Sequence, residues 1–325
     1  MRIPRLVLTS SALSLLLLAT AQAQSSQRFK AVQSESALKL RANDAATAQA
    51  LIAGGAERIA DYGSFQVFSA SSTAAEELAG SGLDNVTFEN VIELHAGAVD
   101  TRATVARQAR AAALSFSGKR LHLVQFAGPV KPEWYRSLEK TGVTVVDYIP
   151  HNAYLVYGDA AALQKVSTLA ASQPAVQFQG AFLNADKIHP TARATASKRQ
   201  PTRLSEGLYQ IQMVADESAN ADTLAVLDAL KLAPFVRQNR TEKYFNVVVK
   251  LPPDALDGLS SQPDILSIWP YATPRKFDER QGMILAGELS GNGPSGPGYL
   301  AWLASKGFTQ SQFDSSALVV DVTDS

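Results

Sequence analysis

The order strand, helix, strand, strand, helix, strand is predicted three times in this chain of 325 residues. Its second occurrence is the clearest. The segment RLHLVQFAG alternates apolar and polar residues as a half-buried strand does, and Pro132 opens the helical segment PEWYRSLEKTG, which closes at Gly142. Two strands in VTVVDYIPHNAYLVYG, a helix in DAAALQKVSTL and a strand in AVQFQGAF complete the set. The fold must therefore accommodate the same six elements repeatedly.

The third occurrence has the same order, in the segments GLYQIQMVA, ADTLAVLDALK, FVRQNRTEKYFNVVVKL, PPDALDGLSSQ and ILSIWPYA. The first is fainter. It has a strand in ALKLRA, a helix in AATAQALIAGG, a hairpin that turns at Gly63, a helix in STAAEELAGS with Ser72 or Thr73 as its cap, and a last strand in NVTFENVIEL. The first-strand leucines Leu38, Leu121 and Leu208 are 83 and 87 residues apart. A period of this length indicates repeated domains, since each unit is large enough to have its own core.

This element order predicts an α/β chain of the α+β kind, built from tandem ferredoxin-like βαββαβ modules. We expect the modules at residues 35–95, 119–184 and 206–273. Each would place two helices on one face of an antiparallel sheet and leave the other face open. An open face that carries apolar side chains is an interaction surface.

The segments between the modules, residues 95–118 and 186–207, are rich in Ala, Ser, Thr and basic residues. Their composition predicts solvated linkers. A second interpretation is that they are protease-accessible joints for processing. The basic residues concerned are Arg102, Arg107, Arg110, Lys198, Arg199 and Arg203.

The first residues indicate an extracytoplasmic protein. Arg2 and Arg5 precede an apolar run at residues 6–18, and Ala21 and Ala23 occupy the small-residue positions before a cleavage point. We expect a signal peptide at residues 1–23 and a secreted or periplasmic product. The alternative, a retained membrane anchor, is disfavoured because the apolar run is short.

Composition excludes several classes of site. The chain has no cysteine, so it has no Cys nucleophile, Cys-ligated zinc or disulfide. Its 30 basic and 30 acidic residues balance, so we expect no nucleic acid partner, and no membrane partner once the signal is removed. The four histidines lie at no metal-binding spacing, and no cofactor is evident.

The segment ALVVDVTDS carries the strongest chemical signal. A run of β-forming residues that delivers an Asp followed by a small hydroxyl residue is typical of an acid at the carboxyl edge of a buried parallel strand. A strand that ends at an ordinary polar turn has the same pattern.

The segment VVDVTDS resembles the first catalytic motif of subtilisin-like serine peptidases, an aliphatic strand followed by Asp-Ser/Thr-Gly. Asp324 and Ser325 stand in the Asp and Ser/Thr places, and the glycine would be the next residue. The preceding QGMILAGELSGNGPSGPGYLAWLASKGFTQSQFDSS looks like the lead-in to the catalytic domain of large bacterial secreted subtilases. The resemblance implies that residues 276–325 begin a truncated subtilisin-like α/β catalytic domain.

The resemblance also implies a role for Asp324 as the acid of a Ser-His-Asp triad. Asp321 is the rival acid, and Ser325 is not the nucleophile. The His and Ser motifs of the family are missing, so this chain alone should be inactive, and we expect its reading frame to continue with glycine. Calcium, frequent in the family, has no visible site here.

Two functions follow. The first is the amino-terminal part of a secreted serine endopeptidase precursor, whose modules act as a pro-region that chaperones and inhibits its own catalytic domain. The full-length enzyme would cleave protein or peptide substrates. The second is an exported, non-catalytic inhibitor or binding protein built of ferredoxin-like repeats.

Overall fold

The chain divides into two compact units, Met1–Tyr271 and Ala272–Ser325. The computed structural model describes residues 37–77, 82–111, 116–195, 207–272, 284, 289–291, 293–295 and 299–316. The predicted signal peptide at residues 1–23 lies outside them. No helix within the described ranges is long and apolar enough to cross a membrane.

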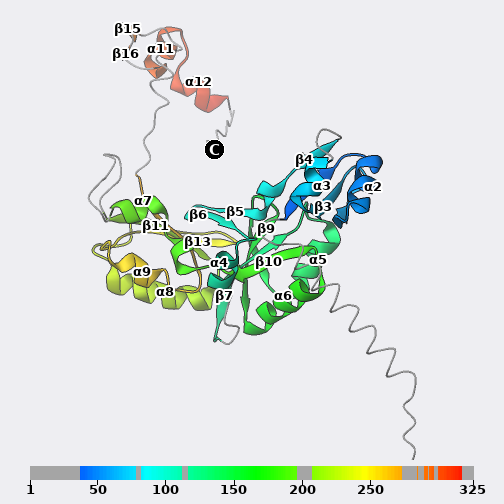
Figure 1. Cartoon of the computed structure of the whole chain (residues 1–325). Coiled ribbons are helices and arrows are strands. Elements are labelled where there is room, and N and C mark those ends of the chain that lie inside the picture. Colours follow the sequence, from blue (N-terminus) through cyan, green and yellow to red (C-terminus); the bar gives the residue numbers. More distant parts are fainter. Residues whose placement is uncertain are drawn as a thin grey trace, which may run out of the picture. The chain divides into compact units, whose positions relative to one another are not determined.

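The first unit contains three four-stranded antiparallel sheets, so the predicted α+β class is confirmed (Figure 1). In each sheet the first and third strands of the module are central, and the second and fourth strands form the edges. In each module, residues of both helices pack in one core against the sheet. We call the three groups modules 1, 2 and 3.

Module 1 has a small core, because its two helices are short. Asp44 caps the first of them by accepting a hydrogen bond from the backbone N–H of Thr47 at 2.8 Å. Leu40, Leu51 and Phe68 are fully buried between helix and sheet. The elements are β1 (Leu38–Ala42), α2 (Ala45–Ala53), β2 (Glu57–Asp61), β3 (Gln66–Ala70), α3 (Ser72–Glu77) and β4 (Leu83–Asn85).

Two predictions for this module are wrong. The side chain of Ser71, rather than that of Ser72 or Thr73, accepts the hydrogen bond from the backbone N–H of Ala74 at the start of α3. The segment NVTFENVIEL is also not one strand. The side chain of Asn85 accepts a hydrogen bond from the N–H of Thr87 at 3.0 Å, a local turn that ends β4. A 3₁₀ turn, η1 (Thr87–Asn90), and a new strand, β5 (Val91–Leu94), follow.

Module 2 has a core on the face of its sheet that carries its two helices. Its helices bury Trp134, Leu138 and Leu163 against one face of the sheet. His151 and Asn152 lie in the three-residue turn between the paired residues Ile149 and Ala153, and their φ values are 67° and 63°. The elements are β7 (Lys119–Phe126), α5 (Pro132–Glu139), β8 (Thr144–Ile149), β9 (Ala153–Asp159), α6 (Ala160–Ser172) and β10 (Val176–Ala181).

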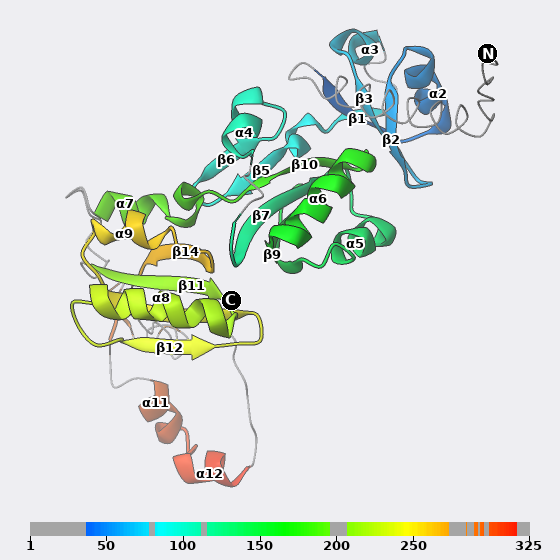
Figure 2. The same ribbon diagram turned by 90° about the horizontal axis from the view of Figure 1, so that it is seen from below.

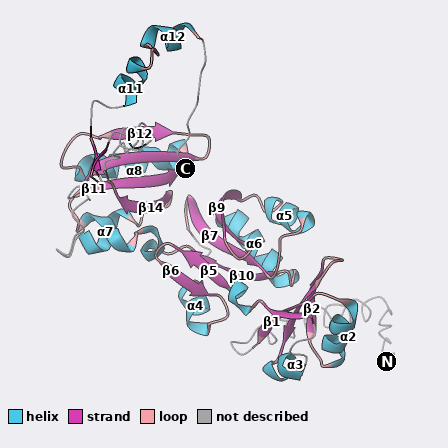
Figure 3. Cartoon of the chain, turned by 90° about the horizontal axis from the view of Figure 1, so that it is seen from above, coloured by secondary structure: helices cyan, strands magenta, loops and turns pink. Residues whose placement is uncertain are grey.

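Module 3 follows the same plan, with the helix α8 against one face of its sheet. Figure 2 shows α8 in front of β11 and β12, and Figure 3, seen from the opposite side, shows the strands in front. Tyr209, Ile211 and Val247 are buried on the helix side. The elements are β11 (Leu208–Val214), α8 (Glu217–Leu230), β12 (Arg237–Arg240), β13 (Tyr244–Lys250), α9 (Ala255–Leu259) and β14 (Ile265–Pro270).

The predicted solvated linkers are wrong for the parts that the structure describes. The first linker contributes β6 (Gly97–Asp100), which pairs with β5, and the helix α4 (Thr104–Ala109). The second contributes the last two residues of η2 (Asn184–Lys187) and the helix α7 (Pro190–Thr195). Composition predicted solvated segments here because they are rich in basic residues, but an arginine can be buried when it is paired. Lys198, Arg199 and Arg203 lie outside the described residues.

Arg110 of the first linker is buried in an ion pair with Asp186 of the second. Its two terminal nitrogens lie 2.5 and 2.8 Å from the carboxylate, and the two side chains are only 7% and 9% exposed. The backbone N–H of Leu183 donates to the same carboxylate at 2.7 Å. The pair therefore joins the two linkers across the end of module 2.

The second sheet face of module 2, which was expected to be open, is covered. The β5–β6 hairpin and residues of module 3 pack on it in one core, which we call the shared core. Its members include Ile92, Val99, Leu121, Leu123, Tyr157, Val214 and Leu266. Modules 2 and 3 are therefore joined by apolar packing rather than by a loose tether.

The second unit has little regular structure within the described residues. It contains the short strands β15 (Leu289–Ser290) and β16 (Gly293–Pro294) and the helices α11 (Tyr299–Ser305) and α12 (Gln310–Ser315). A capping box at Thr309 and Gln312 begins α12. Helix α11 lies in the segment YLAWLASKG.

Candidate functional site

The predicted catalytic acid Asp324 lies outside the described residues, as do its rival Asp321 and Ser325. The last described residue is Ser316, one position after α12 ends. The structure therefore places none of the three. The candidate surfaces described below belong to the first unit.

A row of amide and hydroxyl side chains crosses the face of the module 3 sheet that the helices leave uncovered. Asn239, Asn246, Gln212 and Ser267 are successive cross-strand partners on β12, β13, β11 and β14. We call them the amide row. Cross-strand partners point to the same face, and the alternate residues Ile211 and Val247 belong to the core on the helix side.

The amide row is exposed at one end and faces module 2 at the other. All four residues of the edge strand β12 are exposed. At the opposite end, Gln212 and Ser267 line a hollow of about 310 Å³ between modules 2 and 3. Residues of β5, β8 and β14 complete the hollow, among them Glu93, Asp147 and Trp269.

Three aromatic rings stack at the rim of this hollow. His189 lies over Trp269 with 3.8 Å between ring centroids, and His95 lies 6.0 Å from His189 and 5.5 Å from Trp269. Burial, and next the charge of His189, lower the pKa of His95, and burial lowers that of His189. The neutral rings and Trp269, which is 40% exposed, form an apolar anchor beside two carboxylates. Such a site suits an apolar or basic side chain of a bound polypeptide.

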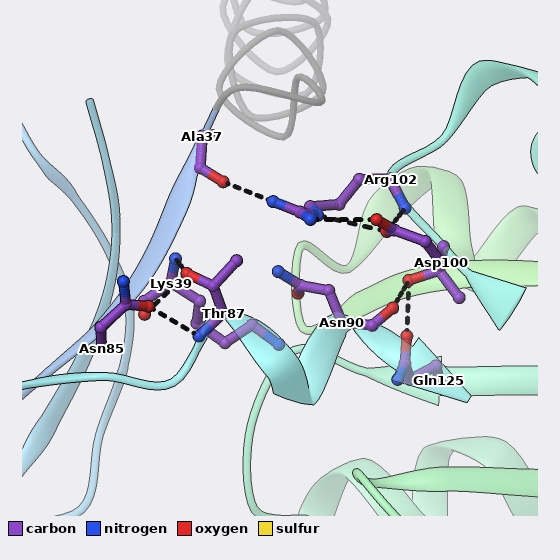
Figure 4. A network of polar contacts seen from close by, with 9 residues as sticks. Ala37, Lys39, Asn85, Thr87, Asn90, Asp100, Arg102 and Gln125 are labelled. Carbon is purple, nitrogen blue, oxygen red and sulfur yellow. Dashed lines mark hydrogen bonds and ion pairs between the residues drawn. The ribbon is translucent and has the colours of Figure 1, made fainter. Parts of the chain in front are cut away.

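A second polar cluster joins module 1 to the β5–β6 hairpin (Figure 4). Oγ1 of Thr101 lies 2.7 Å from the carbonyl oxygen of Asn90 and 2.7 Å from Oε1 of Gln125. Nε2 of Gln125 donates to the carbonyl of Glu89 at 3.0 Å. Arg102 donates to both oxygens of Asp100 and to the carbonyl of Ala37. These bonds hold the start of β1 against the end of β6.

Lys39 of β1 lies in this cluster and is 3% exposed. Its backbone N–H donates to Thr87 at 2.9 Å, but its Nζ has no hydrogen-bond partner among the described residues. Burial lowers the pKa of Lys39 to about 7; the charge of Glu89 opposes this shift, and that of Arg102 adds to it. The sequence gives no signal for this site, because in LKLRA the alternation places Lys39 on the polar side of the strand.

A buried carboxylate, that of Asp264, lies inside module 3. The carboxylate of Asp264 accepts hydrogen bonds from Nδ2 of Asn220 at 2.7 Å and from the hydroxyl of Thr223 at 2.5 Å. Asp264 is 0% exposed, and burial raises the pKa of its carboxyl despite these two bonds. The group fixes the start of β14 to α8.

The raised pKa of Asp264 predicts a pH dependence of stability. Between the unfolded value, about 4, and the raised folded value, the folded chain binds more protons than the unfolded chain, so the free energy of unfolding falls as pH rises through that window. We expect Asp264→Asn to remove this slope. Urea unfolding at a series of pH values measures it, with the exposed Asp254→Asn as control. An unchanged slope in Asp264→Asn would contradict the assignment.

Among the described residues, no group of three or more His, Asp or Glu side chains is placed to hold a metal ion. Residues 93–183 match a family model described as a domain of unknown function, DUF8729. The DUF8729-like region begins within β5 and ends just after β10. It thus combines the β5–β6 hairpin and α4 with module 2, as the shared core does. No curated protein matches the chain.

Proposed function

We propose that this chain is the amino-terminal part of a secreted or periplasmic subtilisin-like serine endopeptidase precursor. Modules 1 to 3 are then ferredoxin-like domains of the pro-region, and residues 276–325 begin the catalytic domain with Asp324 as the triad acid. The partners are the chain's own catalytic domain and, for the full-length enzyme, protein or peptide substrates. The observation that carries the proposal is the Asp-containing motif VVDVTDS after three βαββαβ modules.

The division of the chain supports this proposal. The compact unit that holds the three modules ends at Tyr271, directly after β14, and a separate unit begins at Ala272. A pro-region that is removed by cleavage needs a boundary of this kind between its last strand and the catalytic domain. Arg275 and Lys276 follow that boundary and are the cleavage region that we propose.

The amide row and the adjoining hollow are the part of the pro-region that we propose as its inhibitory surface toward the mature enzyme. The helix-free face of the sheet carries side chains that both donate and accept hydrogen bonds, and Trp269 supplies an apolar anchor. Module 3 is next to the catalytic domain in the sequence, so the effective concentration of this surface near that domain is high.

The test is expression of the reading frame beyond residue 325. We expect it to encode glycine next, then His and Ser motifs, and to yield a peptidase sensitive to serine-directed inhibitors. Amino-terminal sequencing of the mature enzyme should find a start close to residue 276. A start before residue 200, or peptidase turnover by residues 1–325 alone, would contradict the proposal.

The inhibitory surface can be tested with the purified 325-residue chain added to the mature enzyme. We expect Asn239→Arg to raise the inhibition constant about 10-fold or more, because a long charged side chain then occupies the contact face. The control is Gln238→Arg, which puts the same side chain on the other face of the same strand. Equal effects of the two variants would exclude the amide row as the contact surface.

The alternative, an exported binding or inhibitor protein without catalysis, shares the same surfaces. A reading frame without His and Ser motifs, together with inhibition of unrelated peptidases by the purified chain, would favour it. The match of residues 93–183 to a family of domains is compatible with either function.

A further inference from the structure

We propose that the cavity beside Lys39 is a binding site for one small monovalent anion of chloride size, held between module 1 and the β5–β6 hairpin. The cavity has a volume of about 10 Å³. Its polar lining residues lie on β1, β3, η1, α4 and β10 and directly after β6. They include Lys39, Asn90, Thr101, Arg102, Arg107 and Gln177. This site does not depend on the proposed function.

The first argument is the missing partner of Lys39. Lysine is almost never fully buried unless it is paired, because removing an ammonium group from water is costly. Nζ of Lys39 is buried and has no hydrogen-bond partner among the described residues. In Figure 4 its side chain extends from β1 toward the segment that carries Asn90.

The second argument is the charge around the cavity. Arg102 and Arg107 line it together with Lys39. Two acids are near, and neither pairs with the ammonium group. Asp100 forms an ion pair with Arg102. The charge of Glu89 acts on Lys39, but Glu89 forms no ion pair within the described part of the chain. Three cationic groups thus face two anionic groups, and one monovalent anion balances them.

The third argument is size and donor type. A cavity of this volume has room for about one water molecule. It therefore excludes phosphate, sulfate and carboxylate metabolites, and among anions a single-atom halide comes nearest to its size. Asn90, Thr101 and Gln177 add side chains that can donate hydrogen bonds to an anion.

The test is halide-dependent stability of the full 325-residue chain at constant ionic strength. At pH 6, replacing gluconate by chloride should raise the thermal midpoint by about 3 °C. The pKa of Lys39 is about 7, so at pH 9 its amino group is largely deprotonated. Chloride affinity should then be weaker by on the order of 100-fold. Lys39→Met should abolish the halide effect, whereas Lys250→Met, at an exposed strand position, should retain it.

Crystals of the unmodified chain grown in bromide give a second readout that does not depend on the folding of a variant. An anomalous peak within about 3.5 Å of Nζ of Lys39 would support the site. A water molecule in its place, or a thermal midpoint that is insensitive to chloride at pH 6, would overturn it.

Discussion

On the function proposed above, we expect Asp324→Asn in the full-length precursor to lower kcat of the mature peptidase by about 10⁴-fold. The carboxylate of the triad acid holds the catalytic imidazole in the tautomer that accepts the proton of the serine. It then stabilises the imidazolium that forms during attack. An asparagine of the same shape can bind the ring but stabilises the wrong tautomer. The measurement is steady-state hydrolysis of a peptide substrate, with burst titration of active sites to correct for folded enzyme.

The matched control is Asp321→Asn, three residues earlier in the sequence. We expect it to leave kcat within a few-fold of the unmodified enzyme. A large loss at Asp321 with a small loss at Asp324 would show that Asp321 is the triad acid. Full activity of both variants would show that the resemblance to subtilisin-like peptidases does not predict the function of this segment. Self-cleavage of the Asp324→Asn precursor should also stop, so the pro-region should remain attached.

The largest expected effect on stability comes from the buried pair Arg110–Asp186. We expect Asp186→Ala to lower the free energy of unfolding by about 3–5 kcal/mol, because the substitution leaves a guanidinium group buried without its counter-charge. It also removes the acceptor for the backbone N–H of Leu183. Urea unfolding followed by circular dichroism measures the change.

The control for this substitution is Asp257→Ala, which breaks an ion pair of similar length. The carboxylate of Asp257 lies 2.9 Å from Arg193, but the two side chains are 77% and 45% exposed. Exposed pairs contribute about 0–1 kcal/mol. If Asp186→Ala cost no more than Asp257→Ala, the two linkers would not be held together by the buried pair.

The α+β class could be predicted from sequence because each six-element segment carries local signals for its own strands and helices. Pro132 begins α5, and Gly142 follows shortly after its end. The alternation in RLHLVQFAG corresponds to β7. Strand β4 could not be delimited this way, because a side-chain hydrogen bond at Asn85 ends it at the first residue of the segment NVTFENVIEL. Local patterns identify elements but not the hydrogen bonds that interrupt them.

The buried polar residues could not be predicted, for a different reason. Lys39, Arg110 and Asp264 look like ordinary surface charges in their own segments. Arg110 is buried beside Asp186, and Asp264 is buried beside α8. Both partners are far away in the sequence. Burial of a charge depends on tertiary partners, which a single sequence does not display.

The shared core has a consequence for the order in which the chain can fold during synthesis. It contains Ile92 and Leu266, which are 174 residues apart in the sequence. The last strand of the module 2 sheet, β10, ends at Ala181. The apolar face of this sheet is nevertheless not fully covered until β14 has left the ribosome. A nascent chain that stops short of Leu266 exposes this surface, and release or export before that point would leave it available for aggregation.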